Sequence, residues 1–260
     1  MIAFLINSSL LWAIRPVKEY IKYPDSSFIN CQERMVRTSD SFDVALWDCT
    51  SIYDFDTTKP IIIFVEADYG NMSYYLSYIE PMVEAGYRVI SFDYRGFGKS
   101  SQFEINENML YYNEYTNDLK SVVDNVKNLY SSDKIVLFGL SMGTIISTLV
   151  LNQENLNGLI GEGFIFNPFE ICKRVKKIKN KEILLPHDAN LYTQFLSNLK
   201  CKILIVSGKQ DIVTTVEDSQ YIKANNPRRQ IIEFDGGHLQ GMSSLNKKYI
   251  DYINKYIGYL

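Results

Sequence analysis

The chain has 260 residues, of which 46% are apolar and 13% aromatic, and its formal net charge is −3. This composition supplies a sizeable buried core and excludes an intrinsically disordered chain. The main basic run, Lys173 to Lys181, is short. Runs of that size are usually solvated faces, so we expect no nucleic acid as a partner.

Residues 1–25 form an N-terminal extension that is apolar over "MIAFLINSSLLWAI", its first 14 residues. At ~1.5 Å per helical residue this stretch is too short to span ~30 Å of hydrocarbon. Two alternatives remain open: a helix that docks on the domain or makes peripheral membrane contact through residues 1–14, or a signal segment. The first predicts a cytoplasmic, membrane-associated protein, and the second predicts secretion.

Short β-rich runs then alternate with longer stretches of helical period, which is the pattern of an α/β fold. Several of these runs are apolar on both faces, as buried parallel strands are. The expected strands are "FDVALWDC" from Phe42, "PIIIFVE" from Pro60, "YRVISFD" from Tyr87, "KIVLFGL" from Lys134, "LNGLIGEGF" from Leu156, "KILIVSG" from Lys202 and "RQIIEF" from Arg229.

Two amphipathic helices are expected to cover this sheet. Apolar residues recur at spacings of three and four from Tyr115 to Tyr130, and again from Leu245 to Ile257 at the carboxyl end. No linker composition interrupts the chain, so we expect one domain over residues 1–260.

The sequence "GLSMG", Gly139 to Gly143, lies between an expected buried strand and a helix. A serine in such a sharp turn needs close backbone packing on both sides, which the flanking glycines permit. Ser141 is therefore the predicted nucleophile. The backbone N–H of Met142, at the start of the helix, is one predicted donor to an oxyanion.

A serine nucleophile needs a base and an acid further along the chain. Of the two histidines, His238 lies in the glycine-rich "FDGGHLQG" after the last strand, whereas His187 reads as an exposed loop residue. Asp211 ends "KILIVSGKQD" and is the predicted acid. Asp218 is the rival, but it falls within an expected helix. The order Ser141, Asp211, His238 is typical of one hydrolase family.

From about residue 30 onward the sequence resembles the α/β-hydrolase superfamily, and within it the lid-poor esterases and lysophospholipase-like serine hydrolases. The resemblance rests on "DYRGFGKS" from Asp93, on "GLSMG", on "SGKQD" and on "GGH". It implies the α/β-hydrolase fold, with a mostly parallel sheet of about eight strands flanked by helices. Only about 36 residues, from Phe166 to Cys201, precede the acid strand. We therefore expect residues 166–200 to form a small lid or ordinary flanking helices.

The sequence departs from the resembled pattern in "VEADYGNMS", where Glu66 and Ala67 replace a His-Gly pair. By position, the second backbone donor to the oxyanion is then Asp68, or Tyr69 if the loop shifts. A carboxylate here would oppose the developing negative charge unless it were paired. We expect Glu66 to form an ion pair with Arg95 that fixes this loop.

Together these residues predict a serine hydrolase that cleaves a carboxylic ester or thioester, of a small molecule or a lipid, through an acyl-enzyme. No metal or organic cofactor is expected. Cys31, Cys49, Cys172 and Cys201 lack a zinc-like or disulfide-like spacing, so we expect buried free thiols. Two alternatives remain: a catalytically silent binding protein with this fold, and an acyltransferase that uses the same three residues.

Overall fold

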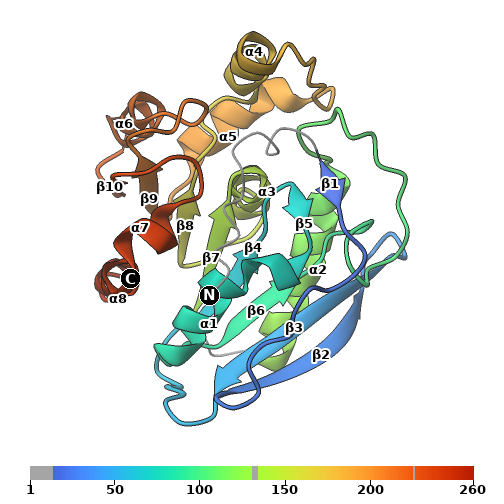
Figure 1. Cartoon of the computed structure of the whole chain (residues 1–260), viewed down its shortest axis with the longest axis vertical. Helices are drawn as coiled ribbons and strands as arrows, with labels where there is room; N and C mark the ends of the chain where they lie inside the picture. The colour runs from blue at the N-terminus through green and yellow to red at the C-terminus, as the bar shows by residue number, and fades with distance from the viewer. Residues whose placement is uncertain (1–13, 131–133, 225) are drawn as a thin grey trace.

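The computed structural model describes residues 14–130, 134–224 and 226–260. Its centre is an eight-stranded sheet in the order β10-β9-β8-β7-β4-β6-β3-β2, shown in Figure 1. From β10 to β6 all neighbours pair in parallel, whereas β3 is antiparallel to both β6 and β2. The strands are β2 Ile29–Arg37, β3 Asp43–Ser51, β4 Ile61–Val65, β6 Val89–Phe92, β7 Ile135–Leu140, β8 Gly158–Glu162, β9 Lys202–Gly208 and β10 Arg229–Phe234.

Helices cover both faces of the sheet. The helices are α1 Leu76–Glu84, α2 Glu114–Leu129, α3 Met142–Leu151, α4 Pro168–Lys179, α5 Tyr192–Asn198, α6 Val216–Ala224, α7 Gly241–Leu245 and α8 Lys247–Ile257. Apolar side chains of α2, α3 and α5 pack with one face of the sheet in a single cluster. Those of α1 and α8 pack in a second cluster on the opposite face. The expected α/β-hydrolase architecture is therefore confirmed.

The interior strands explain why their sequences are almost wholly apolar. All residues of β4, β6, β7 and β8 are buried, because helices lie on both sides of them. The seven expected strands are present within one or two residues of their expected ends. The edge strand β2 was not expected. Most of its residues are partly or fully exposed, so its sequence carries no continuous apolar run.

Residues 166–200 contain α4 and α5, which pack in the same apolar cluster as α2 and α3. Ile171 and Val175 of α4, and Tyr192 and Leu196 of α5, are buried in the first apolar cluster. Arg174 of α4 also donates to the carbonyl oxygen of Val213 at 2.6 Å. Residues 168–179 therefore rest directly on the loop that follows β9.

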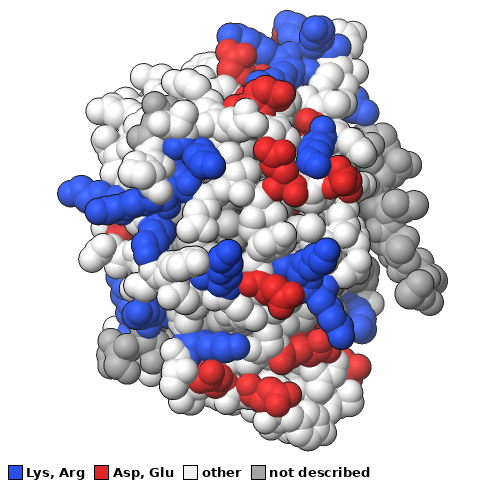
Figure 2. All heavy atoms as spheres, turned by 90° about the vertical axis from the view of Figure 1, so that its left-hand side faces the viewer, with Lys and Arg blue, Asp and Glu red and all other residues white. Residues whose placement is uncertain are grey.

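The basic run forms the exposed side of α4. Figure 2 shows Lys and Arg side chains gathered at the end of the molecule where Figure 1 places this helix. Lys173 pairs with Glu170, and Lys176 pairs with Glu182, each at 2.6 Å. These side chains are exposed, as expected of a solvated face.

Two of the four cysteines are bonded, so the expectation of free thiols is wrong for them. Cys31 and Cys49 form a disulfide and lie opposite each other in the antiparallel register of β2 and β3. The pairing depends on the strand that the sequence did not reveal. Cys172 and Cys201 are free and half-buried, and burial raises the pKa of each thiol to about 11.

The expectation for the apolar N-terminus falls mainly on residues 1–13, which lie outside the described residues. Ile14 is fully buried. The next two residues form β1, Arg15–Pro16, which pairs in parallel with β5, Tyr69–Gly70. Across the described ranges, no helix has both the length and the apolar character needed to cross a membrane.

Candidate active site

Ser141 occupies the turn between β7 and α3, at the carboxyl end of the parallel strands. Its backbone has φ 48° and ψ −113°, a conformation that costs a non-glycine residue conformational energy. Its N–H donates to the carbonyl oxygen of Glu162 at 2.9 Å, which fixes the turn to the end of β8. The side chain is raised at the sheet edge in the position expected for a nucleophile.

The two glycines that flank Ser141 are required by packing. A Cβ on Gly139 would lie 2.7 Å from the carbonyl oxygen of Gly143. A Cβ on Gly143 would lie 2.2 Å from the carbonyl oxygen of Val65. Both distances are too short for real atoms, so the first turn of α3 reaches the end of β4 only because residues 139 and 143 lack side chains.

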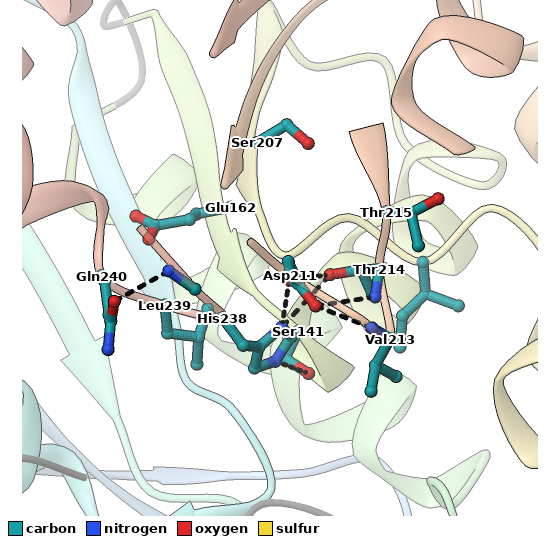
Figure 3. A network of polar contacts seen from close by, with 12 residues as sticks. Ser141, Glu162, Ser207, Asp211, Val213, Thr214, Thr215, His238, Leu239 and Gln240 are labelled. Atoms are coloured by element: carbon teal, nitrogen blue, oxygen red, sulfur yellow. Dashed lines mark hydrogen bonds and ion pairs between the residues drawn. The ribbon is translucent and has the colours of Figure 1, made fainter. Parts of the chain in front are cut away.

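The structure brings the three predicted catalytic residues together, as Figure 3 shows. His238 Nε2 lies 3.1 Å from Ser141 Oγ, and His238 Nδ1 lies 2.7 Å from Asp211 Oδ2. The three residues come from separate loops, after β7, β9 and β10. Parallel strands end at one edge of the sheet, which explains how residues 97 positions apart in sequence meet.

Hydrogen bonds within its own loop hold Asp211 in place. Its Oδ1 accepts from the backbone N–H of Val213 at 2.9 Å and of Thr214 at 3.0 Å. The Thr214 hydroxyl donates to Oδ2 at 2.5 Å. Nothing in the local sequence marks Thr214 as part of the site, because a threonine three residues after an aspartate is common in loops. Its hydroxyl also lies 3.1 Å from His238 Nδ1.

Burial and charge act in opposite directions on this pair. Burial alone would raise the pKa of Asp211, but the charge and hydrogen bond of His238 lower it below the ordinary 3.8. Burial alone would lower the pKa of His238, but Asp211 raises it above the ordinary 6.5, with smaller contributions from Asp68 and Glu162. An imidazolium is therefore favoured at this position more than at the protein surface.

The expected oxyanion donors lie beside the serine turn. Met142 is the first residue of α3, and the first N–H groups of a helix have no acceptor within the helix. A Cβ on Gly143 would also lie 2.7 Å from the carbonyl oxygen of Glu66. The backbone at Glu66, just before Asp68 and Tyr69, thus lies close to the first turn of α3. Asp68 is close enough to His238 to raise its pKa.

The expected ion pair between Glu66 and Arg95 is wrong. Arg95 pairs instead with Asp118 of α2 at 2.7 Å and with Asp40 at 2.6 Å. Glu66 is fully buried and makes no ion pair among the described residues, and the backbone N–H of Tyr94 lowers the pKa of its carboxyl group only in part. Burial, and then the charge of Asp93, raise the pKa of Glu66 well above its ordinary value. A protonated Glu66 carries no negative charge, so it does not oppose the charge of an oxyanion and needs no ion pair with Arg95.

This buried acid predicts a pH-dependent effect of Glu66→Gln on stability. In the unfolded chain Glu66 ionises above its ordinary pKa of 4.5, whereas in the folded chain its raised pKa keeps it protonated to a higher pH. The folded state then binds more protons, so the wild-type chain loses stability as pH rises. Glutamine has no proton to lose. The stability of Glu66→Gln relative to wild type should therefore increase as the pH rises above 4.5, by up to about 1.4 kcal/mol per pH unit.

Urea unfolding at several pH values measures this difference, with exposed Glu107→Gln as the matched control. A difference between wild type and Glu66→Gln that stays constant with pH would show that Glu66 is ionised in the folded chain.

The two rival residues lie away from the serine. His187 is exposed in a turn. Asp218 lies in α6 and is bonded to Arg174, with Oδ1 2.8 Å from the guanidinium. Within residues 14–130, 134–224 and 226–260, no three His, Cys, Asp or Glu side chains gather as metal ligands would.

A groove of about 750 Å³ begins at the histidine loop and runs between α1 and α8. His238, Leu239 and Gln240 are part of its lining, and Ser141 is not. Apolar residues make up much of the remaining surface, including Tyr78, Pro81, Ala85, Met242 and Ile250.

Known proteins resemble this chain in sequence. Residues 57–183, slightly under half of the chain, match the family model described as serine aminopeptidase, S33. An uncharacterized protein of Escherichia coli O157:H7, YfhR, is 27% identical over 195 residues, which cover 72% of this chain and 66% of that protein. The matched region thus spans slightly less than two thirds of this relative.

Solved structures resemble the chain over more of its length. An esterase from Pyrococcus furiosus superposes with a TM-score of 0.77 at 18% identity, covering 96% of this chain and 98% of that one. An esterase from Exiguobacterium antarcticum gives a TM-score of 0.64 at 19% identity, covering 87% and 100%. At these identities the likeness shows a shared fold.

Proposed function

We propose that this α/β-hydrolase is a serine hydrolase that cleaves a carboxylic ester or thioester through an acyl-enzyme on Ser141. The observation that carries the proposal is the continuous contact from Ser141 Oγ through His238 to Asp211, at 3.1 Å and 2.7 Å. The serine aminopeptidase family match and the fold shared with two esterases support hydrolysis of this general kind.

In this mechanism Ser141 Oγ attacks the carbonyl carbon while His238 Nε2 accepts its proton. Asp211 keeps Nδ1 protonated and stabilises the imidazolium through the 2.7 Å contact. The tetrahedral oxyanion is bound by the backbone N–H of Met142 and by that of Asp68 or Tyr69. His238 then protonates the departing alcohol or thiol. Water, activated by the same imidazole, releases the acid and restores Ser141.

The substrate we propose is an acyl ester of a small molecule or a lipid. Its leaving group must lie on the side of His238, because that residue protonates it. The apolar groove between α1 and α8 begins at this histidine. None of the steps requires a metal ion, an organic cofactor or a nucleic acid.

Two other functions compete with this proposal. A silent binding protein is suggested by the altered loop at Glu66 and Ala67, but it would not require an aligned Ser141, His238 and Asp211. An acyltransferase would use the same residues and replace water by another nucleophile.

Labelling with a fluorophosphonate tests the proposal. An activated serine displaces the fluoride, so we expect one covalent adduct, located on the Ser141 peptide by mass spectrometry. The matched control is Ser147→Ala, which removes a buried hydroxyl from α3, the helix that follows Ser141, and should leave labelling intact. A folded wild-type chain that never reacts would favour the binding protein instead.

A further inference from the structure

Glu162 is a buried acid that the proposed mechanism does not use. It is the last residue of β8, and its side chain is fully buried. Its backbone carbonyl accepts from Ser141 N–H at 2.9 Å. The same residue that fixes the serine turn therefore also directs a carboxyl group into the protein.

That carboxyl group is bound by three donors from three segments. Oε1 accepts from the backbone N–H of Gly241 at 2.6 Å. Oε2 accepts from Tyr249 of α8 at 2.8 Å and from Tyr78 of α1 at 3.2 Å. The Tyr78 hydroxyl also lies 3.0 Å from the carbonyl oxygen of Leu239.

Two of these hydrogen bonds hold the residues that follow His238 in its loop. Leu239 directly follows His238, and Gly241 lies three residues after it, so both anchors hold the histidine loop. Figure 3 shows Glu162 next to this loop, on the side away from Thr215. A Cβ on Gly241 would lie 2.7 Å from Glu162 Oε2, so only glycine permits this approach.

Carboxyl groups act on His238, whereas neutral hydrogen-bond donors and His238 itself act on Glu162. His238 faces Asp211, Asp68 and Glu162. Glu162 faces the hydroxyl groups of Tyr78 and Tyr249 and the ring of His238. Burial raises the pKa of Glu162 by more than its three donors and His238 lower it. The net result is a pKa of about 7.

We propose that Glu162 is a positioning residue that ties the histidine loop to the serine turn and places a second negative charge beside the His238 imidazolium. This inference rests on the proposed function, because it assigns a partner to the same base. It distinguishes two effects of one side chain: hydrogen bonds that hold residues 238–241, and a charge that favours the protonated ring.

Glu162→Gln removes the charge and nearly preserves the shape. The hydroxyl groups of Tyr78 and Tyr249 can rotate to accept from the new amide, so the variant should fold. Without the carboxylate, the pKa of His238 should fall by about half a unit to one unit, and kcat should fall by the corresponding factor of about 3 to 10.

NMR titration of the histidine ring protons measures this shift directly. The chain contains two histidines, so exposed His187 serves as an internal reference that should not move. Glu170→Gln, the same change on the exposed side of α4, should leave both titrations unaltered.

Glu162→Asp separates the charge from the hydrogen bonds. Its shorter side chain keeps the charge but loses the contact with Gly241, so kcat should fall while the pKa of His238 stays close to that of wild type. If Gln and Asp shift His238 equally, or if Gln shifts nothing, the proposed charge effect is wrong. Absence of fluorophosphonate labelling on wild-type Ser141 would instead refute the proposed function, whatever the titrations show.

Discussion

Ser141→Ala is expected to lower turnover of a short-chain aryl ester by ~10⁴ to 10⁶, because the variant has no atom that can form the acyl-enzyme. The remaining activity would come from binding and from the oxyanion donors acting on water. The fold should persist. Alanine occupies less space than serine, and the strained backbone is held by the Ser141 N–H bond to Glu162, which does not involve the side chain.

Initial rates and circular dichroism of the purified variant measure the two expectations separately. Ser147→Ala is again the matched control, since Ser147 lies in the helix that follows Ser141 and the variant should retain the wild-type rate. An esterase rate in Ser141→Ala close to that of wild type would place the reaction at another residue.

His238→Ala is expected to lower turnover by a similar ~10⁴ to 10⁶, because serine oxygen without a base is a poor nucleophile at neutral pH. The His238 imidazole lies within hydrogen-bond distance of Ser141 Oγ, with its Nε2 at 3.1 Å. Since the two residues act as one unit, the double variant Ser141→Ala, His238→Ala should lose little more than either single variant.

His187→Ala supplies the control for this second variant. Its side chain is exposed in a turn of the segment between α4 and α5, so the change should leave kcat/KM unaltered. If His187→Ala abolished turnover and His238→Ala did not, the base would be assigned to the wrong histidine.

The strand pattern and the order of Ser141, Asp211 and His238 could be predicted because they depend on local sequence. A buried parallel strand is apolar throughout, and a serine turn needs glycines at fixed distances. The edge strand β2 could not be recognised from the sequence because charged residues lie on both of its faces, as at Glu33 and Arg34. Edge strands are protected in this way from pairing with other chains.

Long-range side-chain partners could not be predicted in the same way. Tyr78 and Tyr249 lie 84 and 87 positions from Glu162 in the sequence. The residues next to Glu162 in the sequence therefore do not indicate which side chains bind its carboxyl group. The error over Glu66 has a related origin. Its strand β4 does lie beside β6, which leads to Arg95. However, Asp118 of α2 binds both the backbone N–H and the side chain of Arg95, which turns the guanidinium away from Glu66.

The Cys31–Cys49 bond has a consequence for the conditions under which the chain matures. Disulfides persist in secreted proteins and in the periplasm, whereas glutathione and thioredoxin keep cytosolic thiols reduced. The bond joins strands that are already neighbours, so it locks the outer edge of the sheet once that edge has formed. A reducing environment would open this bond and leave β2 attached to β3 by backbone hydrogen bonds and side-chain packing alone.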